Sequence, residues 1–136
     1  LNQCDSASLI LLFYMLKDEK IIHTVENRIT FFPNPNIRAL SNEMIDYYHK
    51  YHTLNEADFI SYIYEKPEIL KLFKEIINLK CREKYTDEEI EDYIKLINSY
   101  PVKNKIDVLY KKIKEETDPL KQASILSEIL SLKGVK

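Results

Sequence analysis

The sequence is very poor in glycine: Gly134 is the one glycine among 136 residues, and tryptophan is absent. Loops that cradle phosphates, of the P-loop or dinucleotide-binding kind, need several glycines for tight turns and close backbone approach. Two-residue β-hairpin turns that favour Asn-Gly or Gly-Gly are missing as well. The composition therefore excludes glycine-loop nucleotide sites and argues against a fold built from tight β-hairpins.

Clustered cysteines and long apolar runs are also missing. Cys4 and Cys81 are isolated and belong to no CxxC motif, so they supply too few ligands for a structural zinc site. Two separate thiols are typical of a reduced, cytoplasmic protein. The longest apolar run, Leu9–Leu16, is far shorter than the roughly 18 residues of a membrane span, and there is no signal peptide. The chain begins with Leu1 and not with Met, which suggests a piece of a longer protein.

What the chain does have is apolar residues at three- and four-residue steps over nearly its whole length, the spacing of amphipathic helices. Capping residues and prolines precede these segments. Ile29–Phe32 is the one β-like stretch and has no partner, so we expect an all-α fold of eight helices, with Phe32 in the core. The expected helix starts are Asp5 or Ser6, Asp18, Asn34-Pro35, Asn55, Pro67, the capping box Thr86–Glu89, Pro101 and Asp118-Pro119.

Pro101 marks the expected domain boundary. The residue before a proline is pushed out of helical geometry, so we expect a break or kink at Tyr100. Residues 1–99 would form a six-helix bundle and residues 100–136 a helical hairpin. The charge changes at the same place, with a net charge of −5 in residues 1–100 and +3 in residues 101–136.

The last expected helix carries more apolar surface than one partner helix covers. Its apolar residues spread over roughly 180°, whereas those of the helix before it fall in a stripe roughly 100° wide. One half of the broad stripe is Ile125, Ile129 and Leu132, and the other is Ala123, Leu126 and Leu130. A two-helix hairpin buries one half, so the other half must meet the rest of the chain or another protein.

Candidate chemistry is weak by comparison. Asp46, His49 and His52 follow one another at three-residue steps and are the best candidate for a metal site, but there is no HExxH spacing and tyrosines interleave them. The acidic run 87–92 is better explained as helix-start chemistry, where negative charge stabilises the helix dipole. We therefore predict no catalytic residue, no metal and no cofactor.

The first helix of the expected hairpin is rich in lysine and has no arginine. A solvated face is the default explanation, steering toward an acidic partner protein comes second, and direct nucleic-acid contact comes third. Because the aromatic residues typical of single-strand platforms are not interleaved with these lysines, we expect little direct nucleic-acid binding. The lysines are Lys103, Lys105, Lys111, Lys112 and Lys114.

The order of these segments resembles the C-terminal domain of bacterial DnaG-type DNA primases, over residues 6–134. The resemblance rests on the order and spacing of many residues, since no single piece is a sharp motif. These are Leu11, Leu12 and Met15, then Val25, Ile29 and Phe32, then Arg38, Leu40 and the pair Tyr47-Tyr48, then Glu89-Ile90-Glu91-Asp92-Tyr93-Ile94, and last Lys112-Ile113-Lys114-Glu115-Glu116.

The resemblance implies a six-helix bundle followed by a hairpin that attaches primase to the N-terminal domains of the hexameric, DnaB-type replicative helicase. The zinc-binding and polymerase domains of such a primase would lie upstream, so we expect no enzyme activity here and a monomer in isolation. For the contact we predict Ile125, Ile129 and Leu132, with Lys111 and Lys112 steering; the half with Ala123, Leu126 and Leu130 is the alternative.

Two other functions stay open at this point. The bundle of the primase domain is itself similar to the N-terminal domain of the helicase, so the chain is also compatible with that assembly domain. A small helical metalloenzyme built on Asp46, His49 and His52 is the third possibility.

Overall fold

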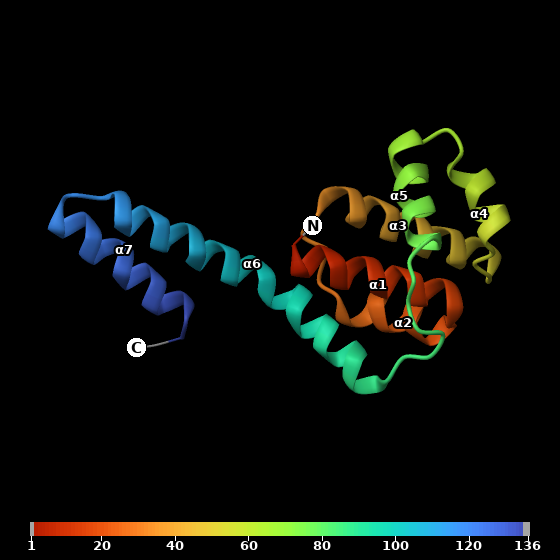
Figure 1. Ribbon diagram of the computed structural model, residues 1–136, viewed down its shortest axis with the longest axis horizontal. Helices are drawn as coiled ribbons and strands as arrows, with labels where there is room; N and C mark the ends of the chain where they lie inside the picture. Colours follow the sequence, from red (N-terminus) through yellow and green to blue (C-terminus); the bar gives the residue numbers. More distant parts are fainter. Residues whose placement is uncertain (1, 135–136) are drawn as a thin grey trace. The chain divides into compact units, whose positions relative to one another are not determined.

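In the computed structural model, which describes residues 2–134, the chain consists of seven α-helices and contains no strand within that range (Figure 1). It divides into two compact units, Leu1–Asn98 and Ser99–Lys136, hereafter the first and second units. Within residues 2–134 no helix has both the length and the apolar composition needed to cross a membrane. The helices are α1 Gln3–Lys17, α2 Glu19–Arg28, α3 Pro35–Tyr51, α4 Glu56–Ile63, α5 Pro67–Ile77, α6 Asp87–Glu115 and α7 Pro119–Leu132.

Side-chain caps explain most of the helix starts. The carboxylate or amide oxygens of Asp18, Asn34, Asn55 and Asp118 each accept a hydrogen bond from a backbone N–H of the first helical turn, which confirms four predicted starts. The first helix begins earlier than predicted. Its cap is Asn2, whose side chain accepts from the backbone N–H of Asp5, so neither Asp5 nor Ser6 starts the helix.

Of the break or kink predicted at Tyr100, the break is wrong. Helix α6 runs from Asp87 to Glu115 with Pro101 inside it, so the described residues hold seven helices and not eight. Proline has no N–H, and the helix therefore forgoes the bond that residue 101 would donate to the carbonyl of Ile97. The residues before and after Pro101 keep the backbone helical, because each of them adds its own backbone hydrogen bond once the helix has formed.

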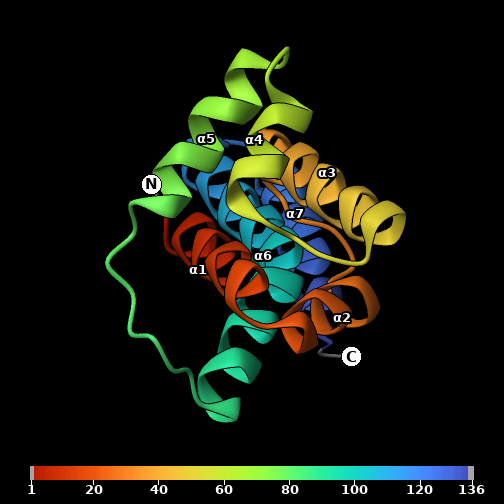
Figure 2. The ribbon, with the colours of Figure 1, turned by 90° about the vertical axis from the view of Figure 1, so that its right-hand side faces the viewer.

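Helix α1 is the centre of the first unit, packed against α2, α3 and α5 (Figure 2). It is apolar all round, which is typical of a helix with neighbours on several sides, and Leu11 and Leu12 are fully buried. Phe32, in the segment between α2 and α3, is buried as the sequence predicts. Phe59 of α4 and Phe73 of α5 are also fully buried, with their ring centroids 4.8 Å apart.

The non-helical segment between α5 and α6 is tied to the junction of α1 and α2 by two tyrosines. The buried Tyr14 donates its hydroxyl hydrogen bond to the carbonyl of Arg82 over 3.0 Å. Tyr85 donates to the carboxylate of Asp18, the residue that ends α1 and caps α2. The two tyrosine rings lie 5.1 Å apart. One carboxylate therefore helps to fix both a helix junction and a long connection.

The hydrogen bond between these groups shifts both of their pKa values. The Tyr85 hydroxyl, followed by the backbone N–H of Lys20, lowers the pKa of Asp18 below its usual range. The same bond, together with burial, raises the pKa of Tyr85 to about 12. A lowered carboxyl pKa stabilises the fold above the carboxyl's ordinary pKa, and that contribution is lost as pH falls through the folded value. A raised tyrosine pKa stabilises the fold below about pH 10, and that contribution is lost as pH rises toward 12.

Tyr85→Phe should remove this bond while keeping the ring. We expect the free energy of unfolding to fall by about 1 kcal/mol near neutral pH, because the pair is partly exposed and solvent screens it. The difference from the wild type should shrink below about pH 4 and again above about pH 10, where one partner titrates. Urea denaturation across pH measures it. A difference that stays constant through the acid range would show that the bond to Asp18 does not form.

Pro101→Ala should stabilise α6, because it restores a backbone donor inside the helix and removes the ring's clash with the preceding turn. We expect a gain of about 1–3 kcal/mol, measured by local hydrogen exchange of the amides around residue 101. Lys103→Ala is the matched control on the exposed surface of the same helix and should change stability by less than about 0.5 kcal/mol. Loss of stability in the proline variant would show that the backbone at 101 needs proline geometry.

Candidate partner-docking surface

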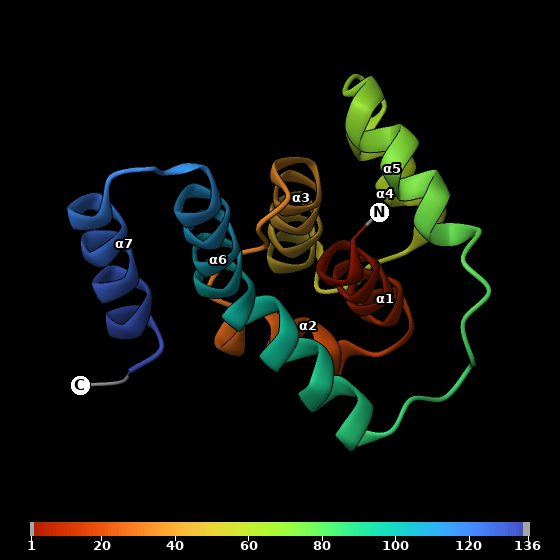
Figure 3. The same cartoon turned by 60° about the vertical axis from the view of Figure 1, so that its left-hand side comes forward.

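The second unit consists of two helical segments that fold back on one another (Figure 3). Glu116 organises the turn: its carboxylate accepts from the backbone N–H groups of Thr117 and Asp118, each over 3.1 Å. Gln122 of α7 donates to the carbonyl of Glu116 over 2.5 Å. Further from the turn, Lys133 Nζ donates to the hydroxyl of Tyr110 over 2.8 Å. These bonds hold α7 alongside the last part of α6.

Burial shows which sides of the two helices are turned inward. Ile129 of α7 has 0% of its surface exposed and Leu109 of α6 has 5%. On each helix the half-buried residues continue the same row at steps of three and four, so both rows have the spacing of a packed helix pair. The inner row is Ile106, Leu109 and Ile113 on α6, and Gln122, Ile125, Ile129 and Leu132 on α7.

This burial corrects the orientation expected for α7. The residues predicted to face a partner, Ile125, Ile129 and Leu132, belong to the inner row: Ile129 is completely buried and the other two are half-buried. The physical reason is the matched spacing, since Ile125, Ile129 and Leu132 repeat in reverse the steps of Ile113, Leu109 and Ile106. That match is visible in the sequence and would have identified the inner half of the broad stripe.

The other half of the stripe is exposed, and we call Ala123, Leu126 and Leu130 the outer stripe. Leu126 is 47% and Leu130 41% exposed, and Ala123 is exposed as well. Lys133 follows Leu130 by three residues and so continues the same face, and its ammonium lies 5.1 Å from the centre of the Tyr110 ring. That contact places the ring of Tyr110 at Lys133, on the edge of the face that carries the outer stripe.

The predicted steering lysines, Lys111 and Lys112, are exposed on α6. In the described part of the chain neither makes an ion pair, so both charges face solvent. Steering acts over the Debye length of about 8 Å, so these lysines need not touch a partner in order to attract it. The lysine that lies at the outer stripe itself is Lys133, which the sequence did not single out.

The residues of the possible metal site are not gathered. All three are exposed: His49 pairs with Glu26 of α2 over 2.5 Å, and His52 ends α3 in the left-handed region at φ 57°. Asp46 also lies on α3, but it forms no metal-binding group with His49 or His52. Among residues 2–134 no group of three or more His, Cys, Asp or Glu side chains lies close enough together to hold a metal ion.

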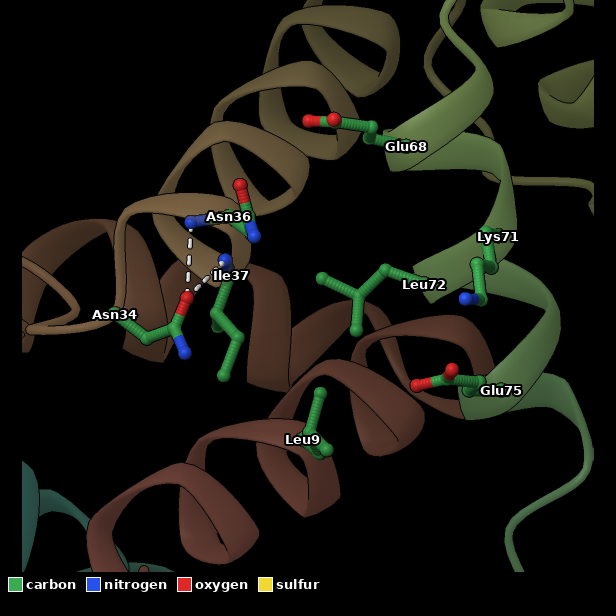
Figure 4. Close-up of a pocket in the computed structure, with 8 residues that line it drawn as sticks. All are labelled: Leu9, Asn34, Asn36, Ile37, Glu68, Lys71, Leu72 and Glu75. Atoms are coloured by element: carbon green, nitrogen blue, oxygen red, sulfur yellow. Dashed lines mark hydrogen bonds between the residues drawn. The ribbon is translucent and has the colours of Figure 1, made fainter. Parts of the chain in front are cut away.

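The first unit also has a cavity of about 350 Å³ between α1, α3 and α5 (Figure 4). Its floor is apolar, from Leu9, Ile37 and Leu72. Its rim carries Asn34, whose amide oxygen already accepts from two backbone N–H groups of α3, and the charged residues of α5. Those charged residues are Glu68, Lys71 and Glu75. The lining pairs no nucleophile with a general base, so it does not have the composition of a catalytic site.

Exposed apolar side chains concentrate on the second unit. Of the nine large apolar side chains that are exposed within residues 2–134, six lie there. A small helical unit that presents such a surface has the features of an interaction module. The fold and this surface therefore define an all-helical protein whose last two helices carry a candidate docking surface.

No protein-family model matches the chain. One curated protein to which it is similar is the DNA primase of Halalkalibacterium halodurans, with 27% identity over 129 residues. The alignment covers 94% of this chain and 21% of the primase. The chain is thus similar, over nearly its whole length, to about one fifth of a DNA primase.

The inner and outer positions of α7 make opposite predictions for stability. Ile129→Ala should remove buried methyl groups and destabilise the second unit by about 2–4 kcal/mol. Leu130→Ala, one residue on and 41% exposed, should cost clearly less, about 1 kcal/mol. Hydrogen exchange of the α7 amides measures both. Equal effects at the two positions would contradict the assignment of the inner row.

Proposed function

We propose that this chain is the helicase-binding domain of a bacterial DNA primase, and that it docks on the N-terminal domains of the hexameric replicative helicase. In this proposal the six-helix bundle of the resembled family corresponds to the first unit, which includes the beginning of α6. The docking hairpin of that family corresponds to the second unit. The observation that carries the proposal is the outer stripe on α7, in a chain similar to part of a DNA primase.

The outer stripe supplies a short-range attraction suited to docking. Leu126 and Leu130 lie one helical turn apart and each exposes nearly half of its surface. Burying a whole leucine side chain is worth about 1.5–3 kcal/mol, so these two half-exposed residues together would contribute about 2 kcal/mol. Tyr110, which contacts Lys133 and is 40% exposed, adds an aromatic ring, a residue type enriched at interface hot spots.

Charge supplies the long-range part of the attraction. The last 36 residues, 101–136, are basic, with a net charge of +3. Lys111 and Lys112 would raise the rate at which an acidic partner surface is met, while Lys133 at the outer stripe would pair with a carboxylate at the rim of the contact. The proposed partner surface is therefore an apolar groove edged with carboxylates.

On this proposal the domain itself performs no catalysis and holds no cofactor or metal. The chain spans about one fifth of the primase it matches, so the synthesis of primers belongs to the remainder of such a protein. The domain's contribution is to keep that activity at the replication fork by binding the helicase, in the cytoplasm. By itself it would be a monomer.

The second candidate, the N-terminal assembly domain of the helicase, is less well supported, because the relative is a primase. The two functions differ in the partner they need. A primase domain stays monomeric until helicase is added, whereas an assembly domain associates with copies of itself, which light scattering on the isolated chain distinguishes.

Replacing both leucines of the outer stripe, Leu126→Asp with Leu130→Asp, should abolish co-elution with the hexameric helicase, because two carboxylates would be buried at the contact. The matched control, Ser124→Asp with Ser131→Asp, adds the same charge to exposed positions on the opposite side of α7 and should retain most of the binding. Both variants should keep the helical circular dichroism of the wild type. Full binding by the leucine variant would contradict the docking surface.

A further inference from the structure

A second surface feature lies on the first unit, where α4 ends and α5 begins. Tyr64, the residue that caps the C-terminus of α4, is 71% exposed. Its ring borders a groove of about 440 Å³ whose other lining residues all belong to α5. These are Pro67, Leu70, Lys71 and Lys74.

Tyr64 differs from the tyrosines around it. Tyr47, Tyr51 and Tyr62 pack on one another, with ring centroids between 4.7 and 6.4 Å apart. In the described part of the chain Tyr64 makes neither a ring contact nor a hydrogen bond. A large ring exposed to this extent, with no structural partner, is free to stack on a ligand.

The groove is also cationic. Lys71 and Lys74 lie three residues apart on one side of α5, and neither makes an ion pair in the described residues. The carboxylates of α5, Glu68 and Glu75, stand three residues before and four residues after Lys71, and all three residues line the neighbouring cavity (Figure 4). No carboxylate is among the residues that line the groove itself.

We propose that this groove binds single-stranded nucleic acid, with a base stacked on the Tyr64 ring and neighbouring phosphates held by Lys71 and Lys74. An exposed aromatic ring next to a short row of cations is the combination by which proteins bind single strands without sequence preference. An acidic peptide would use the lysines equally well. However, a peptide also gains affinity from pockets for its side chains, and the floor here has only Pro67 and the half-buried Leu70.

The proposal changes, for this one groove, the expectation of little direct nucleic-acid binding. The contact would be weak, because only two phosphates are neutralised and residues 1–100 carry a net charge of −5. A weak contact suffices where the strand is already near, since tethering raises the effective concentration. That a weak contact suffices rests on the proposed function, which would keep the strand near. The contact itself does not require docking, so loss of either one would leave the other intact.

The test is fluorescence anisotropy of a labelled oligothymidylate titrated with the full chain at low salt. We expect saturable binding that Tyr64→Ala weakens about tenfold and that Tyr64→Phe, which keeps the ring face, leaves within about twofold. For two phosphate contacts the logarithm of the binding constant should fall against the logarithm of salt concentration with a slope of about −1.4. Lys71→Gln with Lys74→Gln should bring that slope close to zero.

Two matched controls locate the binding. Tyr51→Ala removes another exposed tyrosine, and Lys111→Gln with Lys114→Gln removes two cations at the same spacing from α6; both should leave affinity within about twofold. Absence of saturable binding, or an equal loss from the α6 pair, would overturn the proposal. So would Tyr64-dependent binding of a labelled acidic peptide in place of the oligonucleotide.

Discussion

Two helices that pair along their length bury one stripe of each, and the function proposed for this chain depends on that limit. The apolar residues of α7 span roughly 180° of its circumference, whereas packing on one helix buries a stripe of roughly 100°. The inner row closes around the fully buried Ile129, and the outer stripe is left in solvent. Which leucines a partner can touch is therefore decided by the internal packing of the second unit. Its docking surface is what remains after that packing is satisfied.

The first unit follows a different constraint. Its central helix α1 is apolar on all sides and is covered by α2, α3 and α5, which leaves little apolar surface for a partner. The long connection after α5 runs outside regular structure and is fixed by hydrogen bonds from Tyr14 and Tyr85. What the unit offers to solvent is mostly polar, with the Tyr64 groove as a local exception.

Much of the local structure could be predicted from the sequence, because caps and prolines act on the residues next to them. Asp18, Asn34, Asn55 and Asp118 start helices as predicted. Pro101 is the instructive failure. Its local preference against helix is real, but bonds on both sides of it outweigh a cost of about 3 kcal/mol. The all-α class was predictable for a related reason, since apolar spacing at steps of three and four recurs along the whole chain.

The candidate site was predictable only in part. Apolar width showed that α7 must have an unpaired half, but choosing the half required the spacing of α6 to be compared with it, residue by residue. Ile106, Leu109 and Ile113 match Ile125, Ile129 and Leu132, and this match turns Leu126 and Leu130 outward. The position of Tyr110 depends on its contact with Lys133 of the other helix, and that of Tyr64 on a groove formed with α5. No local pattern in the sequence predicts either position.

The most direct test of the central claim is a nuclear magnetic resonance titration of the isotopically labelled chain with the N-terminal domain of the replicative helicase. The account predicts that the largest chemical-shift changes fall on Ala123, Leu126 and Leu130 and on Tyr110. The chemical shifts of amides in the core of the first unit should change little. Changes confined to the first unit, or centred on the opposite side of α7 at Ser124 and Ser131, would contradict it.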